Sequence, residues 1–145
     1  MADRELIDGL IGTYRDLNNR VRPLPEQRLA LKSDGHSIRD IVRRMRNDEL
    51  RFSQALKERI SGVSITEVFG ADAEPVLGTE QSHESTATLL AQFGTAREST
   101  LAQLRSLSEE QWSANDAHSV RTMVTRLSTN DKKMMERIVG LLGSP

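Results

Sequence analysis

Residues 37–60 read SIRDIVRRMRNDELRFSQALKERI, a pattern from which the rest of the architecture can be worked out. Apolar residues recur along it every three or four positions, which is the period of an amphipathic α-helix. Ser37 precedes the first apolar residue and Asp40 stands three positions later, a variant of the capping box that begins helices. Gly62 follows the last apolar residue, and glycine commonly ends a helix. We therefore expect a long helix that begins at Ser37 and ends before Gly62.

The same period recurs in three further segments, which predict three more helices. Their apolar stripes run through residues 6–21, 89–107 and 119–141. Pro23 and Pro25 stop the first of these helices because proline lacks the N–H that a helix needs, and Gly143 closes the last. No segment alternates apolar and polar residues at period two, as a half-buried strand would. The sequence therefore predicts an all-α protein.

The stretch around Ser37 occurs a second time in the chain. Residues 35–45 (GHSIRDIVRRM) align with residues 117–127 (AHSVRTMVTRL), and upstream residues 24–29 (LPEQRL) echo residues 107–112 (LSEEQW). A helical hairpin of this size cannot bury its own apolar face, so it must pack against its copy. The predicted architecture is a four-helix bundle made of two pseudo-repeated helical hairpins, with residues 1–145 forming a single domain.

The two hairpins are joined by residues 61–80, which mix turn-forming and apolar residues. A helix of about 24 residues is roughly 36 Å long, and an extended connector of about twenty residues spans more than that. We therefore expect a long crossover between helices two and three, which would then run in the same direction. Ser64 and Glu67 form a capping box that predicts a short helix inside the crossover.

Composition excludes several classes of function. The chain has 145 residues, 20 Lys and Arg against 21 Asp and Glu, and no cysteine. The lack of cysteine excludes disulfides, thiolate nucleophiles and Cys-based zinc sites. A charged N-terminus and the absence of any apolar run of about 20 residues predict a cytoplasmic protein with no signal peptide and no membrane partner.

Arginines gather between Arg39 and Arg51, but Asp40, Asp48 and Glu49 lie among them. A nucleic-acid surface needs one sign of charge, and the aromatic residues that stack on bases make up only 3% of this chain. We therefore expect a salt-paired helix face and no nucleic-acid partner.

The apolar stripes are interrupted by polar residues at one common level. Between Met45 and Phe52 the core-facing position is assigned to Asp48, with Glu49 beside it. The last helix carries Asn130 and Asp131 at the matching positions of the repeat, and the third carries Arg97 on its own stripe. Buried carboxylates are costly unless they are paired and hydrogen-bonded. Two interpretations remain open, a satisfied polar cluster or a ligand site walled by helices.

The candidate pocket at this level has six residues: Arg44, Asp48, Arg97, Asn130, Asp131 and Met134. We expect Arg44, one turn before Asp48, to pair with Asp48 or Asp131, or to receive an anionic ligand such as a carboxylate through bidentate hydrogen bonds. His36 and His118 are expected in connectors and His83 at the start of helix three. No nucleophile–base pair or Gly-rich phosphate loop is present.

Three motifs resemble those of the DinB family of helical bundles. They are the run Ser37–Met45 with acidic Glu49 after it, the run Leu104–Trp112, and the segment Asn130–Ile138. The resemblance implies a bundle with a long crossover between helices two and three. It also implies nickel or zinc held by three histidines, and for some members a thiol-dependent transferase or isomerase activity.

The three ligand positions of the DinB family fall on Arg44, Asn130 and Met134 of this chain. Arginine has no free lone pair for a metal, and neutral Asn and thioether Met are poor ligands for nickel or zinc. We therefore expect no metal and no other cofactor. The leading hypothesis is a metal-free DinB-like protein that binds a small molecule, with an anion as one candidate, or a protein partner, with homodimerisation as a further option. The alternative is a metal-independent relative of the thiol-dependent transferases or isomerases, in which Arg44 and Asp131 orient the substrates.

Overall fold

The computed structural model describes residues 2–61, 84–113 and 119–143. These residues form six α-helices and no strand, which confirms the predicted all-α class. The helices are α1 (Ala2–Val21), α2 (Glu26–Leu29), α3 (Ile38–Ser61), α4 (Thr86–Arg105), α5 (Glu109–Ser113) and α6 (Val120–Leu142). The expected crossover 61–80, with its capping box, lies outside the described residues except for Ser61.

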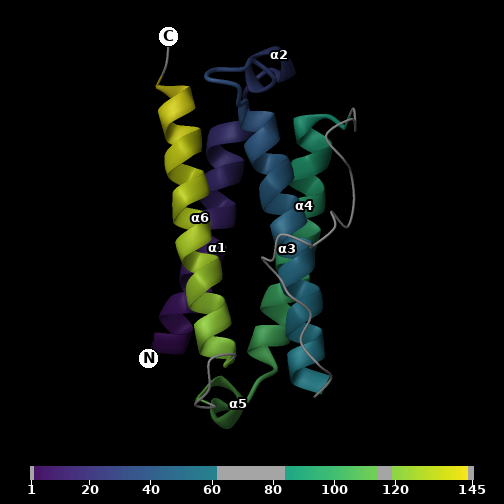
Figure 1. The fold of residues 1–145 in the computed structure, drawn as a ribbon, viewed down its shortest axis with the longest axis vertical. Coiled ribbons are helices and arrows are strands. Elements are labelled where there is room, and N and C mark those ends of the chain that lie inside the picture. Colours follow the sequence, from purple (N-terminus) through teal and green to yellow (C-terminus); the bar gives the residue numbers. More distant parts are fainter. Residues whose placement is uncertain (1, 62–83, 114–118, 144–145) are drawn as a thin grey trace.

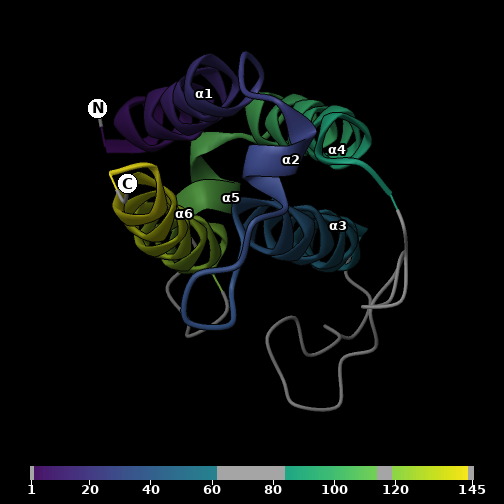
Figure 2. The same cartoon turned by 90° about the horizontal axis from the view of Figure 1, so that it is seen from above.

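The four long helices lie side by side, and the two short ones cover opposite ends (Figure 1). Both α1 and α3 contact α4 and α6, so each long helix has two neighbours. Seen from above, α1, α4, α3 and α6 follow one another around a common centre (Figure 2). None of the helices in the described part of the chain is long and apolar enough to cross a membrane.

Helices α3 and α4 run in the same direction, as the length of the connector between them suggests. Arg46 contacts Gln92 and Ser53 contacts Ser99, and both pairs are 46 positions apart. Because contacting residues stay the same number of positions apart along both helices, the two helices run parallel. Figure 1 shows the same arrangement, with both helices descending from the α2 end to the α5 end.

The apolar core is divided into two clusters. The cluster at the α2 end contains Leu17, Val21, Leu29, Ile38, Ile41, Val42, Met45, Leu89, Leu90, Phe93, Met134 and Ile138. The cluster at the α5 end contains Leu10, Phe52, Leu56, Leu101, Leu104, Trp112, Val120, Val124 and Leu127. On α3, α4 and α6 the break between the clusters falls at the level where the apolar stripes are interrupted in the sequence.

The repeated stretch begins both α3 and α6 with a serine cap. The Asp40 amide donates to Ser37 Oγ at 3.0 Å and the Ser37 amide donates to Asp40 Oδ2 at 3.1 Å, which completes the predicted capping box. In the second copy the Thr122 amide donates to Ser119 Oγ at 3.1 Å. Local sequence therefore sets where both helices begin.

Helix α2 makes hydrogen bonds to the N-terminal end of α4 and to the C-terminal end of α6. Glu26 accepts hydrogen bonds from the Thr86 amide (2.9 Å) and hydroxyl (3.1 Å) at the start of α4. Arg28 Nη2 donates to the carbonyl of Leu142 at the end of α6, at 2.9 Å. An acid at a helix N-terminus and a base at a C-terminus both match the helix dipole, so α2 stabilises this end of the molecule.

Candidate functional site

The guanidinium of Arg97 lies at the centre of the molecule, completely buried. Its Nε and Nη2 donate to the two carboxylate oxygens of Glu49, both at 2.9 Å. Its Nη1 and Nη2 donate to the two oxygens of Asp131, both at 3.0 Å. Nη1 also donates to the carbonyl of Leu10 at 2.9 Å. These bonds use all five N–H donors of an arginine and join α4 to α3, α6 and α1.

We call Arg97, Glu49 and Asp131 the Arg97 layer. Each of its members occupies a position on the apolar stripe of its helix. On α3 the buried series includes Met45, Glu49 and Phe52, and on α6 Asp131 takes the equivalent place between Leu127 and Met134. Spacings of three and four residues keep side chains on one helix face, so these polar groups point inward with their apolar neighbours.

Glu49, the neighbour of the predicted core-facing Asp48, makes the central contact with Arg97. One residue is about 100° of helix rotation, so the side chains of Asp48 and Glu49 point in different directions. Asp48 is nevertheless only 5% exposed, since it lies in the seam between α3 and α6. Both Asp48 and Glu49 fit the spacing of three and four residues between Met45 and Phe52, so the stripe alone does not identify the central carboxylate.

The charges of the Arg97 layer are strongly coupled. Burial alone would lower the pKa of Arg97, but the carboxylates of Glu49 and Asp131 raise it above its ordinary value. Burial raises the pKa of Glu49, and the charge and hydrogen bonds of Arg97 oppose that rise. The guanidinium carbon also lies 4.9 Å from the centre of the Phe93 ring, a favourable cation–π distance. Arg97 is therefore a permanent cation.

A second polar group surrounds Asp48 in the α3–α6 seam. Asn130 Nδ2 donates to Asp48 Oδ2 at 3.2 Å, and the guanidinium groups of Arg44 and Arg51 lie 3.7 and 3.4 Å from its oxygens. Burial raises the pKa of Asp48, and Arg44 and Asn130 counteract this rise. The side chain of Arg44 is 64% exposed, so Arg44 pairs with Asp48 from outside. The central cation is thus Arg97 and not Arg44.

The six predicted pocket residues are therefore divided among three places. Arg44, Asp48 and Asn130 meet in the α3–α6 seam, and Arg97 and Asp131 meet in the Arg97 layer. Met134 is buried in the apolar cluster at the α2 end. The hydrogen bonds at the centre correspond to a satisfied polar cluster, the first of the two interpretations of the sequence.

The residues at the implied metal position do not fit nickel or zinc. Arg44 and Asn130 both approach the same oxygen of Asp48, and Met134 is packed among apolar side chains. Within residues 2–61, 84–113 and 119–143, no three His, Cys, Asp or Glu side chains lie together as a metal would require. His36 lies exposed in a tight turn where Asp34 and Gly35 have positive φ, and His83 and His118 lie outside the described residues.

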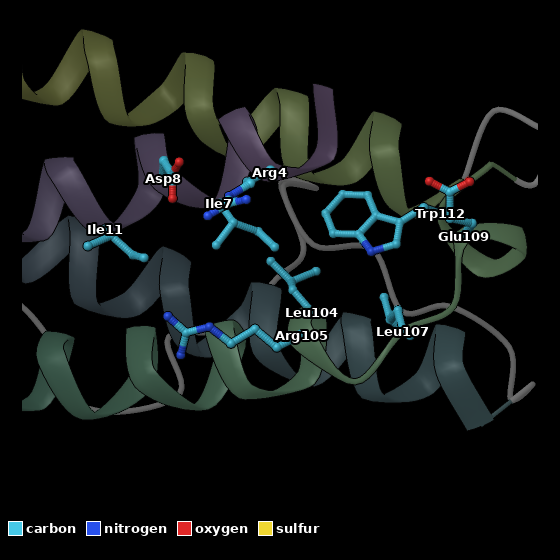
Figure 3. Close-up of a pocket in the computed structure, with 9 residues that line it drawn as sticks. All are labelled: Arg4, Ile7, Asp8, Ile11, Leu104, Arg105, Leu107, Glu109 and Trp112. Carbon is cyan, nitrogen blue, oxygen red and sulfur yellow. The ribbon is translucent and has the colours of Figure 1, made fainter. Parts of the chain in front are cut away.

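A cleft of about 400 Å³ lies at the α5 end, between α1 and α4 (Figure 3). Its apolar lining consists of Ile7, Ile11, Leu104, Leu107 and Trp112. Its charged lining consists of Arg4, Asp8, Arg105 and Glu109. Trp112, only 4% exposed, is the single tryptophan of the chain. The sequence does not predict this cleft, because its residues come from three separate segments and share no motif.

Comparison with protein-family models, with curated proteins and with solved structures yields no match to this chain. The DinB resemblance therefore depends on the sequence motifs alone.

Proposed function

We propose that the chain is a DinB-like four-helix bundle, built from two related hairpins, that binds a small organic ligand without a metal. The observation that carries the metal-free part of this proposal is the set of five hydrogen bonds from Arg97 to Glu49, Asp131 and the Leu10 carbonyl. A metal centre joins helices by drawing ligands from several of them, and here one guanidinium joins all four long helices.

The Arg97 layer is suited to stabilising the bundle and not to catalysis. General acid–base catalysis needs a group that titrates near the working pH and reaches the substrate. Arg97 is held in its charged form, and the side chains of Arg97, Glu49 and Asp131 are 0%, 1% and 4% exposed. A substrate cannot reach these groups without opening the core. The ligand must therefore bind elsewhere.

The cleft at the α5 end offers more charged groups to orient a ligand than a second hollow in the described structure. That hollow, of about 540 Å³, follows the α3–α4 seam and is lined mostly by short side chains, with Lys57 as its one charged residue. The α5-end cleft combines apolar walls, a tryptophan and charges of both signs. Ligand sites usually have apolar walls with a few polar groups that orient the ligand.

A thermal-shift screen of small organic compounds, run in the presence of a chelator and again with added nickel or zinc, tests this proposal. A compound at 100 times its Kd stabilises a protein by about 2.7 kcal/mol, which raises the Tm of a domain of this size by about 5–10 °C. We expect at least one compound to give such a rise equally with and without chelator. Near-stoichiometric nickel or zinc in tag-free protein, or a screen without any stabilising compound, would contradict the proposal.

A further inference from the structure

The cleft at the α5 end has walls that define a chemical class of ligand. We infer that it binds a small amphipathic zwitterion, a molecule whose apolar body carries both an ammonium and a carboxylate group. This rests on the proposed ligand-binding function and adds to it the place of binding and the class of ligand.

The apolar part of the cleft is built from three elements. Ile7 and Ile11 lie one turn apart on α1, Leu104 lies on the last turn of α4, and Trp112 on α5 lies with them in Figure 3. A volume of about 400 Å³ falls within the range of small-molecule sites, about 300–1,000 Å³. The walls therefore suit a compact apolar body, and a ring can pack against the indole of Trp112.

The charged part of the cleft is balanced. Arg4 and Asp8 lie on α1, Arg105 on α4, and Glu109 at the start of α5, which gives two cations and two anions. None of these four side chains forms an ion pair with another described residue. Arg4 and Asp8 have the i,i+4 spacing at which opposite charges on a helix commonly pair, yet they do not pair with each other.

A balanced set of charges favours a ligand that carries both signs. A ligand with only a negative charge would be attracted by Arg4 and Arg105 but repelled by Asp8 and Glu109. A ligand with only a positive charge would be attracted by the two acids and repelled by the two arginines. A zwitterion can present its carboxylate to a guanidinium, which binds carboxylates through two parallel hydrogen bonds, and its ammonium to an acid. Each of these contacts is exposed and therefore modest, so we expect each rim charge to change the Kd by about two- to fivefold.

Trp112 provides a direct reporter, because no other tryptophan contributes to the fluorescence of the chain. Three probes share one phenylethyl body: phenylalanine carries both charges, 3-phenylpropionate only the carboxylate, and phenethylamine only the ammonium. Each is titrated against the full chain while the emission of Trp112 is followed. We expect saturable changes with the lowest Kd for phenylalanine.

Two variants separate the two charges of the ligand. Arg105→Gln should raise the Kd for phenylalanine until it equals the Kd for phenethylamine. Glu109→Gln should raise the Kd for phenylalanine until it equals the Kd for 3-phenylpropionate. Arg137→Gln and Glu136→Gln, at exposed positions in the half of α6 nearest the α2 end, are the matched controls and should leave all Kd values unchanged. All four positions are exposed, so the fold should tolerate each change.

Three outcomes would overturn the inference: equal or tighter binding of a singly charged probe, equal effects of the cleft and control variants, or no response of Trp112 to any probe. If the fluorescence of Trp112 does not change with any probe while a screened compound still raises the Tm, the ligand-binding function stands and only the inferred site and ligand class are wrong. If no compound raises the Tm, the proposed function fails as well.

Discussion

Replacing Arg97 by methionine tests whether the Arg97 layer holds the four long helices together. The substitution keeps an unbranched side chain on the α4 stripe but removes the cation and its five hydrogen bonds. It leaves Glu49 and Asp131 buried and without their guanidinium partner, because their side chains are only 1% and 4% exposed.

The expected loss is large compared with the stability of a domain. Removing one partner of a buried ion pair costs about 3–5 kcal/mol, against a total free energy of unfolding of about 5–15 kcal/mol. Replacing a whole buried ion-pair group by apolar residues is by contrast often neutral, or stabilising by about 1–4 kcal/mol. Arg97→Met should therefore lose about 3–5 kcal/mol, and the triple variant Arg97→Met, Glu49→Met, Asp131→Leu should regain most or all of it.

Urea unfolding followed by circular dichroism measures these differences, and pH provides a second test. Without Arg97, the main group that opposes the effect of burial on the pKa of Glu49 is lost. A carboxyl whose folded pKa exceeds its unfolded value of about 4.5 contributes stability below that value and loses it as pH rises through the folded pKa. The difference in the free energy of unfolding between Arg97→Met and the unaltered chain should thus become smaller as pH falls from 7 to 5.

If Arg97→Met unfolds at the same urea concentration as the unaltered chain, the Arg97 layer does not hold the helices together. If the triple variant is no more stable than the single one, the cost does not come from unpaired carboxylates. A deficit that is independent of pH between 5 and 7 would contradict the assigned role of Glu49.

Three further predictions concern single positions. Gly94→Ala would place a Cβ in overlap with the Tyr14 hydroxyl oxygen and 2.8 Å from Tyr14 Cζ, so we expect a loss of about 1–3 kcal/mol. Adding Tyr14→Phe to Gly94→Ala should restore part of it, and a lack of any loss would mean that Tyr14 simply moves away. Ser37→Ala removes the acceptor of the Asp40 amide at the start of α3 and should cost about 1 kcal/mol in thermal unfolding; an unchanged Tm would show that the cap is dispensable. Burial raises the pKa of Asp48 above 3.8, so its contribution to stability is present at low pH and is lost as pH rises through the raised value. Asp48→Asn should therefore be as stable as the unaltered chain at pH 7, or slightly more stable, and its stability should depend less on pH. A clear loss of stability at pH 7 would show that the ion pairs of Asp48 outweigh the cost of burying it.

The helical class and the positions of the long helices could be predicted from the sequence because their signals are local. Apolar spacing, the Ser37 cap and the stops at Pro23 and Gly143 each act within a few residues, and α1, α3, α4 and α6 follow them. The short helices α2 and α5 were not predicted, although the echo between residues 24–29 and 107–112 marks both. A helix of four or five residues is too short to show an apolar period.

The interruption of the core by polar residues at one level could also be predicted from the sequence, since it is visible in the stripes of three helices. Which of these polar residues contact one another depends on the tertiary structure. Glu49 and Asp131 lie 48 and 34 positions from Arg97 along the chain, and their pairing depends on how each helix is rotated about its axis. One position corresponds to about 100° of rotation, so a stripe alone does not separate Glu49 from Asp48. The α5-end cleft depends even more on tertiary structure, because it exists only where α1, α4 and α5 come together.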